Sequence, residues 1–341
     1  MQLDWLTASW YRPSILRFLL WPVSVVFCAL TILRKQLYRL TLLRTHWFPV
    51  PVIVVGNITV GGTGKTPLVI KLVELCRKAG YTPGVISRGY GVQAESYPMV
   101  LREGHTAASV GDEPLMIFRH TGCRVVIDPD RPRGVGRLLK SQCDIVISDD
   151  GLQHYALGRD MEIAVIDGAR GLGNRMCLPA GPLREPVTRL ADVDMTVISD
   201  TSGKNRRAHA SAGWRMHLEP RCFVNVFDAG RRQPLDAFRR QRVHAVAGIG
   251  NPGRFFLNLS DLGCETEQHV FPDHHPYMLT DMQFGDDRPV IMTEKDAIKF
   301  EQYIGQMPAE EYSRYWYLKA DVVVDDESAF LKELMSFLEE K

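Results

Sequence analysis

Acidic residues are absent between Asp4 and Glu74, although the 341-residue sequence has a formal net charge of +1. A nearly neutral total argues against a protein-wide nucleic-acid-binding surface, so we expect no nucleic-acid partner. The acid-free stretch contains an apolar run, FLLWPVSVVFCALTIL, at 18–33. Its basic residues up to position 45 are Arg12, Arg17, Arg34, Lys35, Arg39 and Arg44.

Paired cysteines are also missing from the sequence. None of its seven cysteines forms a C-x-x-C pair. The spacing therefore indicates neither a cysteine zinc site nor a disulfide framework. A reducing compartment fits this cysteine usage best.

The apolar run at 18–33 is short for a membrane-spanning helix. Its residues would extend about 24 Å as a helix, against a hydrocarbon core of about 30 Å. Pro22 is expected to interrupt its first turns, and the basic residues after the run argue against a cleaved signal peptide. We predict that residues 1–45 form a helical segment associated with a membrane surface, peripheral or monotopic. The interfacial candidates are Trp10, Trp21 and Trp47. The alternatives are a buried core helix with a solvated basic flank, and a spanning helix.

Short apolar, β-branched runs alternate with helical patterns along the rest of the chain, which predicts an α/β sheet covered on both faces. The predicted strands are 51–56, 82–89, 123–128, 144–150, 162–167, 194–200, 244–250, 289–296 and 315–324. The predicted helices include 65–79, about 131–141 and 326–340. The polar, basic stretch 201–220 is the best linker candidate. It would separate a core domain at 46–200 from a C-terminal α/β domain at 221–341.

The segment GNITVGGTGKTP (56–67) ends like a phosphate-binding loop. The usual pattern is G-x-x-x-x-G-K-[ST], and Thr59 stands where its first glycine belongs. Gly61, Gly62 and Gly64 still allow backbone N–H groups to face phosphates at a helix N-terminus. In this pattern Lys65 reaches the β- and γ-phosphates and the Thr66 hydroxyl suits Mg²⁺. Thr63 lies on the same loop; the alternative is an ordinary glycine turn.

Acidic residues follow the predicted strand CDIVISDDG. Asp149 and Asp150 at its end are placed to hold Mg²⁺, as a Walker B acid does. Because neighbours on a strand face opposite sides, we expect one of them at the metal and the other at a water or loop. The alternative is an Asp-Asp-Gly turn at the strand end.

Three further segments carry weaker indications of chemistry. VGDEP (110–114) offers Asp112 and Glu113, either as catalytic acids or as a helix opening. FPDHHPY (271–277) offers His274 and His275, which could bind metal, orient an acid, cap the following helix, or belong to a polar loop before it. LPAGPLREP (178–186) is either a lid or a connection.

Together these segments resemble the tetraacyldisaccharide 4′-kinase family of lipid A biosynthesis. The matching segments, from about residue 50 to 300, are VVGNITVGGTGKTP, ISRGYG, VGDEP, ISDDGLQHYAL with GRD, LPAGPLRE, AGIGNP, FPDHHPY and TEKDAIK. The resemblance implies a P-loop NTPase-like core sheet joined to a smaller C-terminal α/β domain, with the nucleotide in the cleft. The family's own loop resembles this one, so Thr59 is no departure from it.

The resemblance also implies a reaction and its partners. The γ-phosphate of ATP, with Mg²⁺, would pass to the 4′-hydroxyl of tetraacyldisaccharide 1-phosphate. The partners would be this lipid A disaccharide-1-phosphate precursor and an anionic membrane surface, with no protein partner implied. The location would be the cytoplasmic face of the inner membrane of a Gram-negative bacterium.

Roles for individual residues follow from the same resemblance. Asp112 matches the catalytic base, His274 its tuning partner, and Lys65 a catalytic phosphate ligand. Expected around the nucleotide are Gly61, Gly62, Thr63, Gly64, Lys65, Thr66 and Gln153. Expected around the metal are Thr66, Glu113, Asp149 and Asp150. Arg184 and Glu185 are expected at the substrate.

Asp112 and His274 belong to different predicted domains. We therefore expect domain closure to assemble the pair and to exclude water. The histidine would raise the effective basicity of the carboxylate.

Two other classes of protein share part of these features. A P-loop GTPase should carry N/T-K-x-D, but in Thr293-Glu294-Lys295-Asp296 the lysine comes one place late. A non-catalytic nucleotide-binding module at a membrane would keep the loop without needing Asp112. Asp112→Ala, tested for ATP binding and for transfer, discriminates this class from a kinase.

Overall fold

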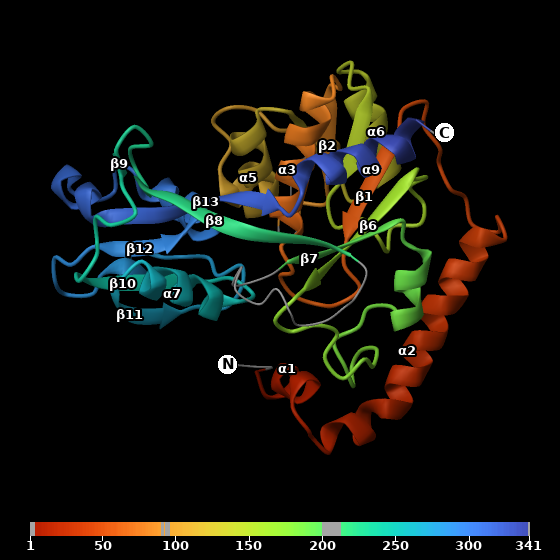
Figure 1. Cartoon of the computed structure of the whole chain (residues 1–341), viewed down its shortest axis with the longest axis horizontal. Helices are drawn as coiled ribbons and strands as arrows, with labels where there is room; N and C mark the ends of the chain where they lie inside the picture. Colours follow the sequence, from red (N-terminus) through yellow and green to blue (C-terminus); the bar gives the residue numbers. More distant parts are fainter. Residues whose placement is uncertain (1–3, 90–91, 93–95, 200–212, 340–341) are drawn as a thin grey trace.

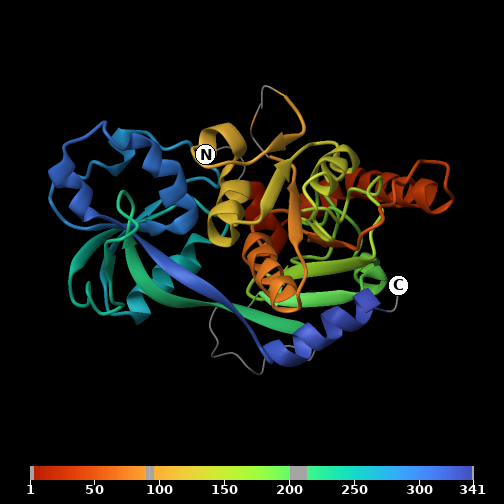
Figure 2. The same ribbon diagram turned by 90° about the horizontal axis from the view of Figure 1, so that it is seen from above.

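The computed structural model describes residues 4–89, 92, 96–199 and 213–339. The end of ISRGYG and the first part of the predicted linker lie outside these ranges. One continuous sheet runs through the molecule in the order β11-β10-β12-β13-β8-β7-β6-β1-β5-β2-β4-β3, with β9 beside β8. Helices lie on both faces of this sheet (Figures 1 and 2). The α/β fold predicted from the sequence is therefore confirmed.

The part of the sheet around the phosphate loop is parallel except at its β3 edge. Its strands are β1 (Val52–Gly56), β2 (Pro83–Ser87), β3 (Met99–Val100), β4 (Arg124–Ile127), β5 (Ile145–Ser148), β6 (Met161–Asp167) and β7 (Met195–Ser199). Its helices are α3 (Lys65–Lys78), α4 (Ala107–Val110), α5 (Asp112–Thr121), α6 (Arg131–Leu139) and the 3-10 helix η1 (Val187–Asp192). β1 and β5 are buried along their whole length, which explains their unbroken apolar sequences. We call residues 46–199 the P-loop half.

The other part of the sheet, which we call the outer half (residues 226–314), is smaller. Its strands are β9 (Arg232–Gln233), β10 (Arg242–Ala247), β11 (Glu265–Val270) and β12 (Val290–Thr293). Its helices are α7 (Pro252–Asp261), α8 (Glu294–Phe300) and the 3-10 turns η2 (Leu279–Met282), η3 (Glu301–Tyr303) and η4 (Ala309–Arg314). The strand predicted at 289–296 ends at Thr293, because the Thr293 hydroxyl accepts from the Asp296 N–H and begins α8.

Two long antiparallel strands connect the halves, β8 (Trp214–Asn225) and β13 (Tyr315–Val324). The linker predicted over 201–220 is therefore wrong for residues 214–220, which form the first half of β8. Trp214, Met216 and Leu218 alternate there with polar residues, a two-residue period that indicates a strand. The basic character of the surrounding sequence masked this period.

The C-terminal helix α9 (Glu327–Glu339) returns to the P-loop half. Phe330, Leu334 and Leu338 belong to the core cluster beneath α3, and Glu327 forms ion pairs with Lys71 at 2.5 Å and with Lys78 at 2.6 Å. By its contacts α9 thus belongs with the P-loop half, although it falls within the C-terminal domain predicted at 221–341.

Two helices precede the sheet, α1 (Asp4–Tyr11) and α2 (Leu16–Arg39). α2 contains 24 residues with Pro22 inside it, so it is longer than the apolar run predicted, about 36 Å. By length and composition it is one helix that could cross a membrane. The large apolar side chains of α2 are exposed, which contradicts the alternative that it is a buried core helix. The most exposed are Phe18, Leu19, Trp21, Val23, Val26, Leu30 and Leu33.

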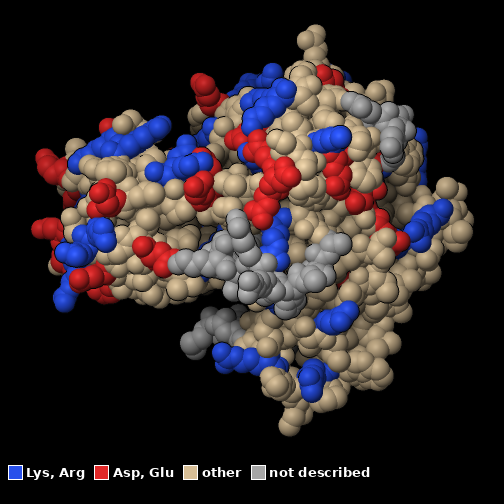
Figure 3. All heavy atoms as spheres, in the orientation of Figure 1, with Lys and Arg blue, Asp and Glu red and all other residues tan. Residues whose placement is uncertain are grey.

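One narrow side of α2 docks on the P-loop half. The Ser24 hydroxyl donates to the Cys177 carbonyl and accepts from the Ala180 N–H at 3.2 Å. Lys35 and Arg39 both pair with Asp192. Figure 3 shows the surface over α1 and α2, at the lower right, as mostly uncharged with scattered basic groups.

The three tryptophans predicted at a membrane interface differ in exposure. Trp21 and Trp47 are 55% and 68% exposed, so both stay candidates for a membrane interface. Trp10 is buried and donates to the Pro179 carbonyl at 3.0 Å, so its prediction as an interfacial residue is wrong. The indole N–H makes burial possible because it finds an acceptor.

Candidate functional site

The phosphate loop lies between β1 and α3, as the sequence predicts. Gly64 caps α3 at a φ of 89°, and Gly61 has a φ of 96°, conformations that favour glycine. The buried Asn57 side chain donates to the Gly61 carbonyl at 3.3 Å and to the Thr63 hydroxyl at 3.2 Å. Asn57 thus stabilises the conformation of the loop, and the Thr63 hydroxyl already accepts a hydrogen bond from it.

Thr59 shapes the first bend through a neighbouring loop. It forms an antiparallel bridge with Leu183, flanked by the hydrogen bonds Val60 N–H to Pro182 O (2.8 Å) and Arg184 N–H to Ile58 O (2.7 Å). The chain is therefore extended where a standard loop turns on glycine. The segment 178–186 supports the phosphate loop as well as making a connection.

Asp149 and Asp150 lie just beyond β5 and diverge from each other. Asp150, at a φ of 48°, pairs with Lys65 at 3.6 Å and with Arg184 at 3.2 Å. Burial alone would raise the pKa of Asp150, but the charges of Lys65 and Arg184 outweigh it and lower that pKa. Asp149 is fully buried and accepts from the Ser87 hydroxyl at 3.3 Å.

The Asp149 carboxylate has the properties of a cation ligand. Its Oδ1 is buried without a hydrogen-bond partner among the described residues. Burial, followed by the charges of Glu113 and Asp150, raises the pKa of Asp149. A nearby divalent cation would remove this penalty, and carboxylate and hydroxyl oxygens are the ligands that Mg²⁺ prefers. Asp149, Glu113 and Thr66 therefore fit Mg²⁺, whereas Asp150 already faces two cations.

The structure brings Asp112 and His274 together across the two halves. His274 Nδ1 lies 3.1 Å from Asp112 Oδ2, although 162 residues separate them. Burial would raise the pKa of Asp112, but the hydrogen bond to His274 and the charge of Lys295 lower it to about 2. The same hydrogen bond raises the pKa of His274. The pair therefore draws one member from each half, as the sequence predicts.

Lys295 is a residue of this site that the sequence did not reveal. Its Nζ lies 3.2 Å from Glu113, 3.2 Å from Asp273 and 3.7 Å from Asp112. These three carboxylates raise its pKa in spite of burial, so it stays charged. No local spacing predicts this, because the acids come from α5 and from the loop after β11. The available indication was the segment TEKDAIK, which matches the family without giving Lys295 a role.

These residues line two cavities. The larger, about 450 Å³, lies between the halves and is lined by residues 62–67 on one side and by 249–251 and 293–295 on the other. The smaller, about 210 Å³, is lined by Asp112 and His274. Glu113 faces the larger cavity while its neighbour Asp112 faces the smaller, and Lys295 contacts both acids.

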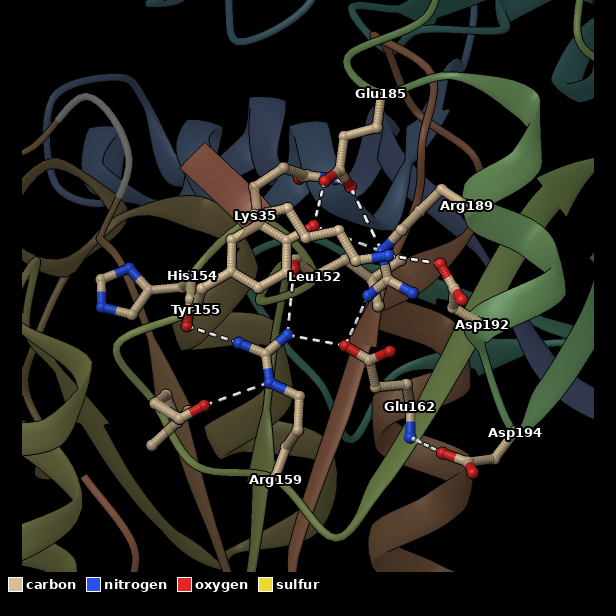
Figure 4. A network of polar contacts seen from close by, with 12 residues as sticks. Lys35, Leu152, His154, Tyr155, Arg159, Glu162, Glu185, Arg189, Asp192 and Asp194 are labelled. Atoms are coloured by element: carbon tan, nitrogen blue, oxygen red, sulfur yellow. Dashed lines mark hydrogen bonds and ion pairs between the residues drawn. The ribbon is translucent and has the colours of Figure 1, made fainter. Parts of the chain in front are cut away.

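Among the remaining predicted site residues, Glu185 lies in a network of polar contacts with Tyr155 and Arg189 (Figure 4). Gln153 donates to the Asn57 carbonyl at 3.0 Å and to Glu185 at 2.9 Å. Glu185 also accepts from the Tyr155 hydroxyl and lies 3.7 Å from Arg189. Gln153 and Glu185 are therefore not among the residues that line the two cavities.

A protein that cradles phosphates on such a loop, and holds a carboxylate–imidazole pair beside it, is a phosphotransferase of the P-loop class. The family model described as "Tetraacyldisaccharide-1-P 4'-kinase" matches residues 16–339. The chain therefore belongs to the tetraacyldisaccharide 4′-kinase family, an enzyme family of lipid A biosynthesis.

Individual relatives agree with this assignment. The tetraacyldisaccharide 4′-kinase of Hahella chejuensis is 44% identical over 98% of this chain and 97% of its own. That of Alkalilimnicola ehrlichii is 46% identical over 93% of this chain and 92% of its own. The solved structure of LpxK from Aquifex aeolicus in complex with ATP covers 95% of this chain and 100% of its own, with a TM-score of 0.78 and 28% identity.

Proposed function

We propose that this protein transfers the γ-phosphate of ATP to the 4′-hydroxyl of tetraacyldisaccharide 1-phosphate. The observation that carries the proposal is the Asp112–His274 pair, 3.1 Å apart, beside a phosphate loop. A hydroxyl acceptor needs a group that takes its proton, and phosphoryl transfer otherwise requires mainly positioning and charge neutralisation.

The loop residues bind and orient the nucleotide in this proposal. The N–H groups around Gly62 and Gly64 face the phosphates at the start of α3, and Lys65 leaves Asp150 to meet the β- and γ-phosphates. Asp149, Glu113 and Thr66 would hold Mg²⁺, which would neutralise charge at those phosphates. ATP is supported by the complex reported for the Aquifex aeolicus relative.

The Asp112–His274 pair takes the hydroxyl proton as a unit. The sugar oxygen forms its bond to the γ-phosphorus, the bond to the β–γ bridging oxygen breaks, and ADP leaves with that electron pair. Because the pKa of Asp112 is lowered and that of His274 raised, the proton comes to rest on the imidazole. Asp112 thus acts through His274, not as a carboxylate of enhanced basicity.

Lys295 serves as a positioning residue in this arrangement. It ties Glu113, beside the nucleotide cavity, to Asp112, beside the smaller cavity. We assign the smaller cavity to the acceptor hydroxyl. Because the pair spans the two halves, closure of the outer half would hold it together and exclude water around it.

Arg184, Gln153 and Glu185 take supporting roles. Arg184 is partly exposed beside Asp150 and can meet an anionic group of the substrate or nucleotide. Gln153 and Glu185 fix the backbone of Asn57 and thereby the first bend of the loop.

The acceptor requires the enzyme to meet a membrane. Withdrawing acyl chains from a bilayer costs about 0.8 kcal/mol per CH₂. The exposed apolar side of α2 would enter the cytoplasmic face of the inner membrane of a Gram-negative bacterium, while Arg34 and Arg44 meet anionic headgroups. Lys35 and Arg39 contribute less than the sequence suggested, because both pair with Asp192.

A GTPase role is not favoured by the TEKD segment. Asp296 is buried and accepts from the Thr293 hydroxyl at 2.6 Å and from the Gly248 N–H at 3.0 Å. It therefore fixes the turn after β10 and the start of α8, and it is not available to read a guanine.

Transfer of ³²P from ATP to purified disaccharide 1-phosphate tests the proposal. Wild type should label the lipid, and Asp112→Ala should lose about 10² to 10⁴ in rate while retaining ATP binding. Glu103→Ala, which removes an exposed carboxylate nearby in sequence, is the matched control. Equal transfer by Asp112→Ala and wild type would refute the assignment of the pair.

A further inference from the structure

Two histidines and a glutamate meet on one face of the outer half. β10 and β11 pair in parallel, with His244 opposite Glu267 and Val246 opposite His269. Since side chains two apart on a strand share a face, this register places His244, Glu267 and His269 together. β11 is the edge strand, at the end of the molecule opposite α2 (Figure 1).

The three side chains present nitrogen and oxygen atoms to a common point. His244 Nδ1 lies 2.9 Å from His269 Nε2, and the Glu267 carboxylate lies 3.9 Å from each of these nitrogens. One ligand atom from each residue falls within 4.8 Å of the others. A shift of a few tenths of an ångström would let one ion reach all three at 2.0–2.2 Å, the distances typical of zinc with nitrogen and oxygen ligands.

The neighbours of His244 fix which nitrogen is available. His244 is 1% exposed, and its Nε2 lies 3.1 Å from Asp286 Oδ1. A carboxylate accepts, so Nε2 carries the proton and Nδ1 presents its lone pair. A carboxylate behind the far nitrogen of an imidazole is the arrangement that orients histidine ligands in metal sites.

Other contacts make the cluster rigid. The Phe284 ring stacks on both imidazoles, with 4.1 Å between centroids in each case. Arg288 donates to Asp286 Oδ2 at 2.6 Å and to Glu267 Oε2 at 2.8 Å. The other oxygen of Glu267 is left facing His269.

We propose that His244 Nδ1, His269 Nε2 and Glu267 bind a divalent transition-metal ion of the zinc class, with a fourth position open to solvent. Imidazole nitrogen with one carboxylate suits Zn²⁺ and Co²⁺, whereas Mg²⁺ prefers oxygen alone. The ion would join the edge strand β11 to β10. The site shares no residue with the phosphotransfer site, so its role is in stability.

Cobalt titration of the full chain, purified without a polyhistidine tag and dialysed against chelator, tests the proposal. Excess Mg²⁺ is kept present to occupy the oxygen-ligand site. Wild type should bind one Co²⁺ with visible absorption, release it to Zn²⁺, and melt at a higher temperature with Zn²⁺. Glu267→Gln and Asp286→Asn should each weaken binding about 10- to 100-fold.

His269→Gln should abolish the cobalt absorption and the zinc-dependent rise in melting temperature. His217→Gln is the matched control, because His217 is also partly exposed and lies 3.9 Å from a carboxylate, that of Asp325. Phosphotransfer should be unchanged in His269→Gln, which also shows that it folds. If His269→Gln does not fold, Glu267→Gln, at a more exposed position, tests the proposal in its place. No cobalt absorption in wild type, or equal binding by Glu267→Gln and wild type, would overturn the proposal.

Discussion

Asp112 and Asp149 show how two buried aspartates acquire opposite properties. Both are removed from water, which by itself raises the pKa of a carboxyl group. The hydrogen bond to His274 and the charges of Lys295 and Lys299 keep Asp112 ionised, whereas the charges of Glu113 and Asp150 raise the pKa of Asp149 further. Asp112 is therefore suited to stabilise an imidazolium, and Asp149 is suited to bind a metal ion.

The dyad should govern the pH dependence of transfer. Its basic form requires neutral His274, whose pKa is raised by Asp112, so kcat/KM should fall as the pH drops through a value above about 6.5. His274→Asn suits the left-handed backbone at φ 61° and leaves only Asp112. The acidic limb should then move to lower pH, and the plateau rate should fall about 10²-fold. Rate profiles from about pH 5 to pH 9, with His105→Gln as control, check this; an unmoved limb would count against the dyad.

Removing the Lys295 charge should shift the acidic limb of the pH–rate profile to higher pH. Lys295 lowers the pKa of both Asp112 and His274, so Lys295→Met should raise the pKa of the pair and shift the limb to higher pH. Transfer at neutral pH should fall about tenfold, because less of the pair is in its basic form. Lys295→Arg keeps the charge and should restore the wild-type limb. Loss of rate without any shift would indicate a structural role only.

At the scale of elements, the phosphate loop depends on a close approach between the halves. A Cβ at Gly250 would lie 2.8 Å from the Gly62 nitrogen and 3.2 Å from its Cα. Gly250, before α7, thus lets the segment AGIGNP touch the loop. Gly64 also lies in a close contact, because a Cβ there would be 2.9 Å from Ser199 Oγ at the end of β7.

Gly250→Ala should therefore weaken nucleotide binding. Two backbones would have to separate by a few tenths of an ångström, and we expect ATP affinity to drop about 10-fold with a smaller loss of stability. Calorimetric titration with ATP measures this. Gly136→Ala, in α6 with open space around its Cβ position, is the control and should stabilise by about 0.5–1 kcal/mol. Equal ATP affinity in the two variants would show that the contact is incidental.

The predictability of these elements follows from their burial. β1, β5 and β6 were predicted within two residues, because fully buried parallel strands are unbroken apolar runs. β11 was missed, since ETEQHV at a sheet edge has no apolar face. The sequence does not indicate a strand there without its partner β10.

How much of the site could be predicted depends on how close its residues lie in the sequence. The phosphate loop could be inferred from local spacing, because one strand, one turn and one helix form it. The pairing of Asp112 with His274 came only from family resemblance, and Lys295 was missed, because their partners lie 162 and 182 residues away in the sequence. Contacts of that kind depend on the order of strands in the sheet, which local pattern does not determine.

At the scale of the molecule, α2 is the one described helix that presents a long apolar side to the outside. Leu19, Val26 and Leu30 form a stripe along it, spaced seven and four residues apart and 59–73% exposed. Its opposite side is anchored to the segment around Cys177 and Ala180. The helix can therefore enter a membrane without leaving the protein.

Replacing that stripe should release the protein from membranes. Leu19→Gln with Val26→Gln and Leu30→Gln removes about 2 kcal/mol of apolar burial per site, and the membrane-bound fraction should fall at least about tenfold. Sedimentation with vesicles containing anionic lipid measures it. Leu257→Gln with Val270→Gln, both exposed in the outer half, is the control. Wild-type sedimentation of the triple variant would place the membrane contact on another surface.

The return of α9 to the P-loop half has a consequence for the order in which the protein is made. The chain leaves that half along β8, builds the whole outer half, and comes back along β13 before α9 covers α3. Phe330, Leu334 and Leu338 thus emerge from the ribosome only after the whole outer half. The P-loop half, though begun first, cannot close its core until the whole outer half has been made.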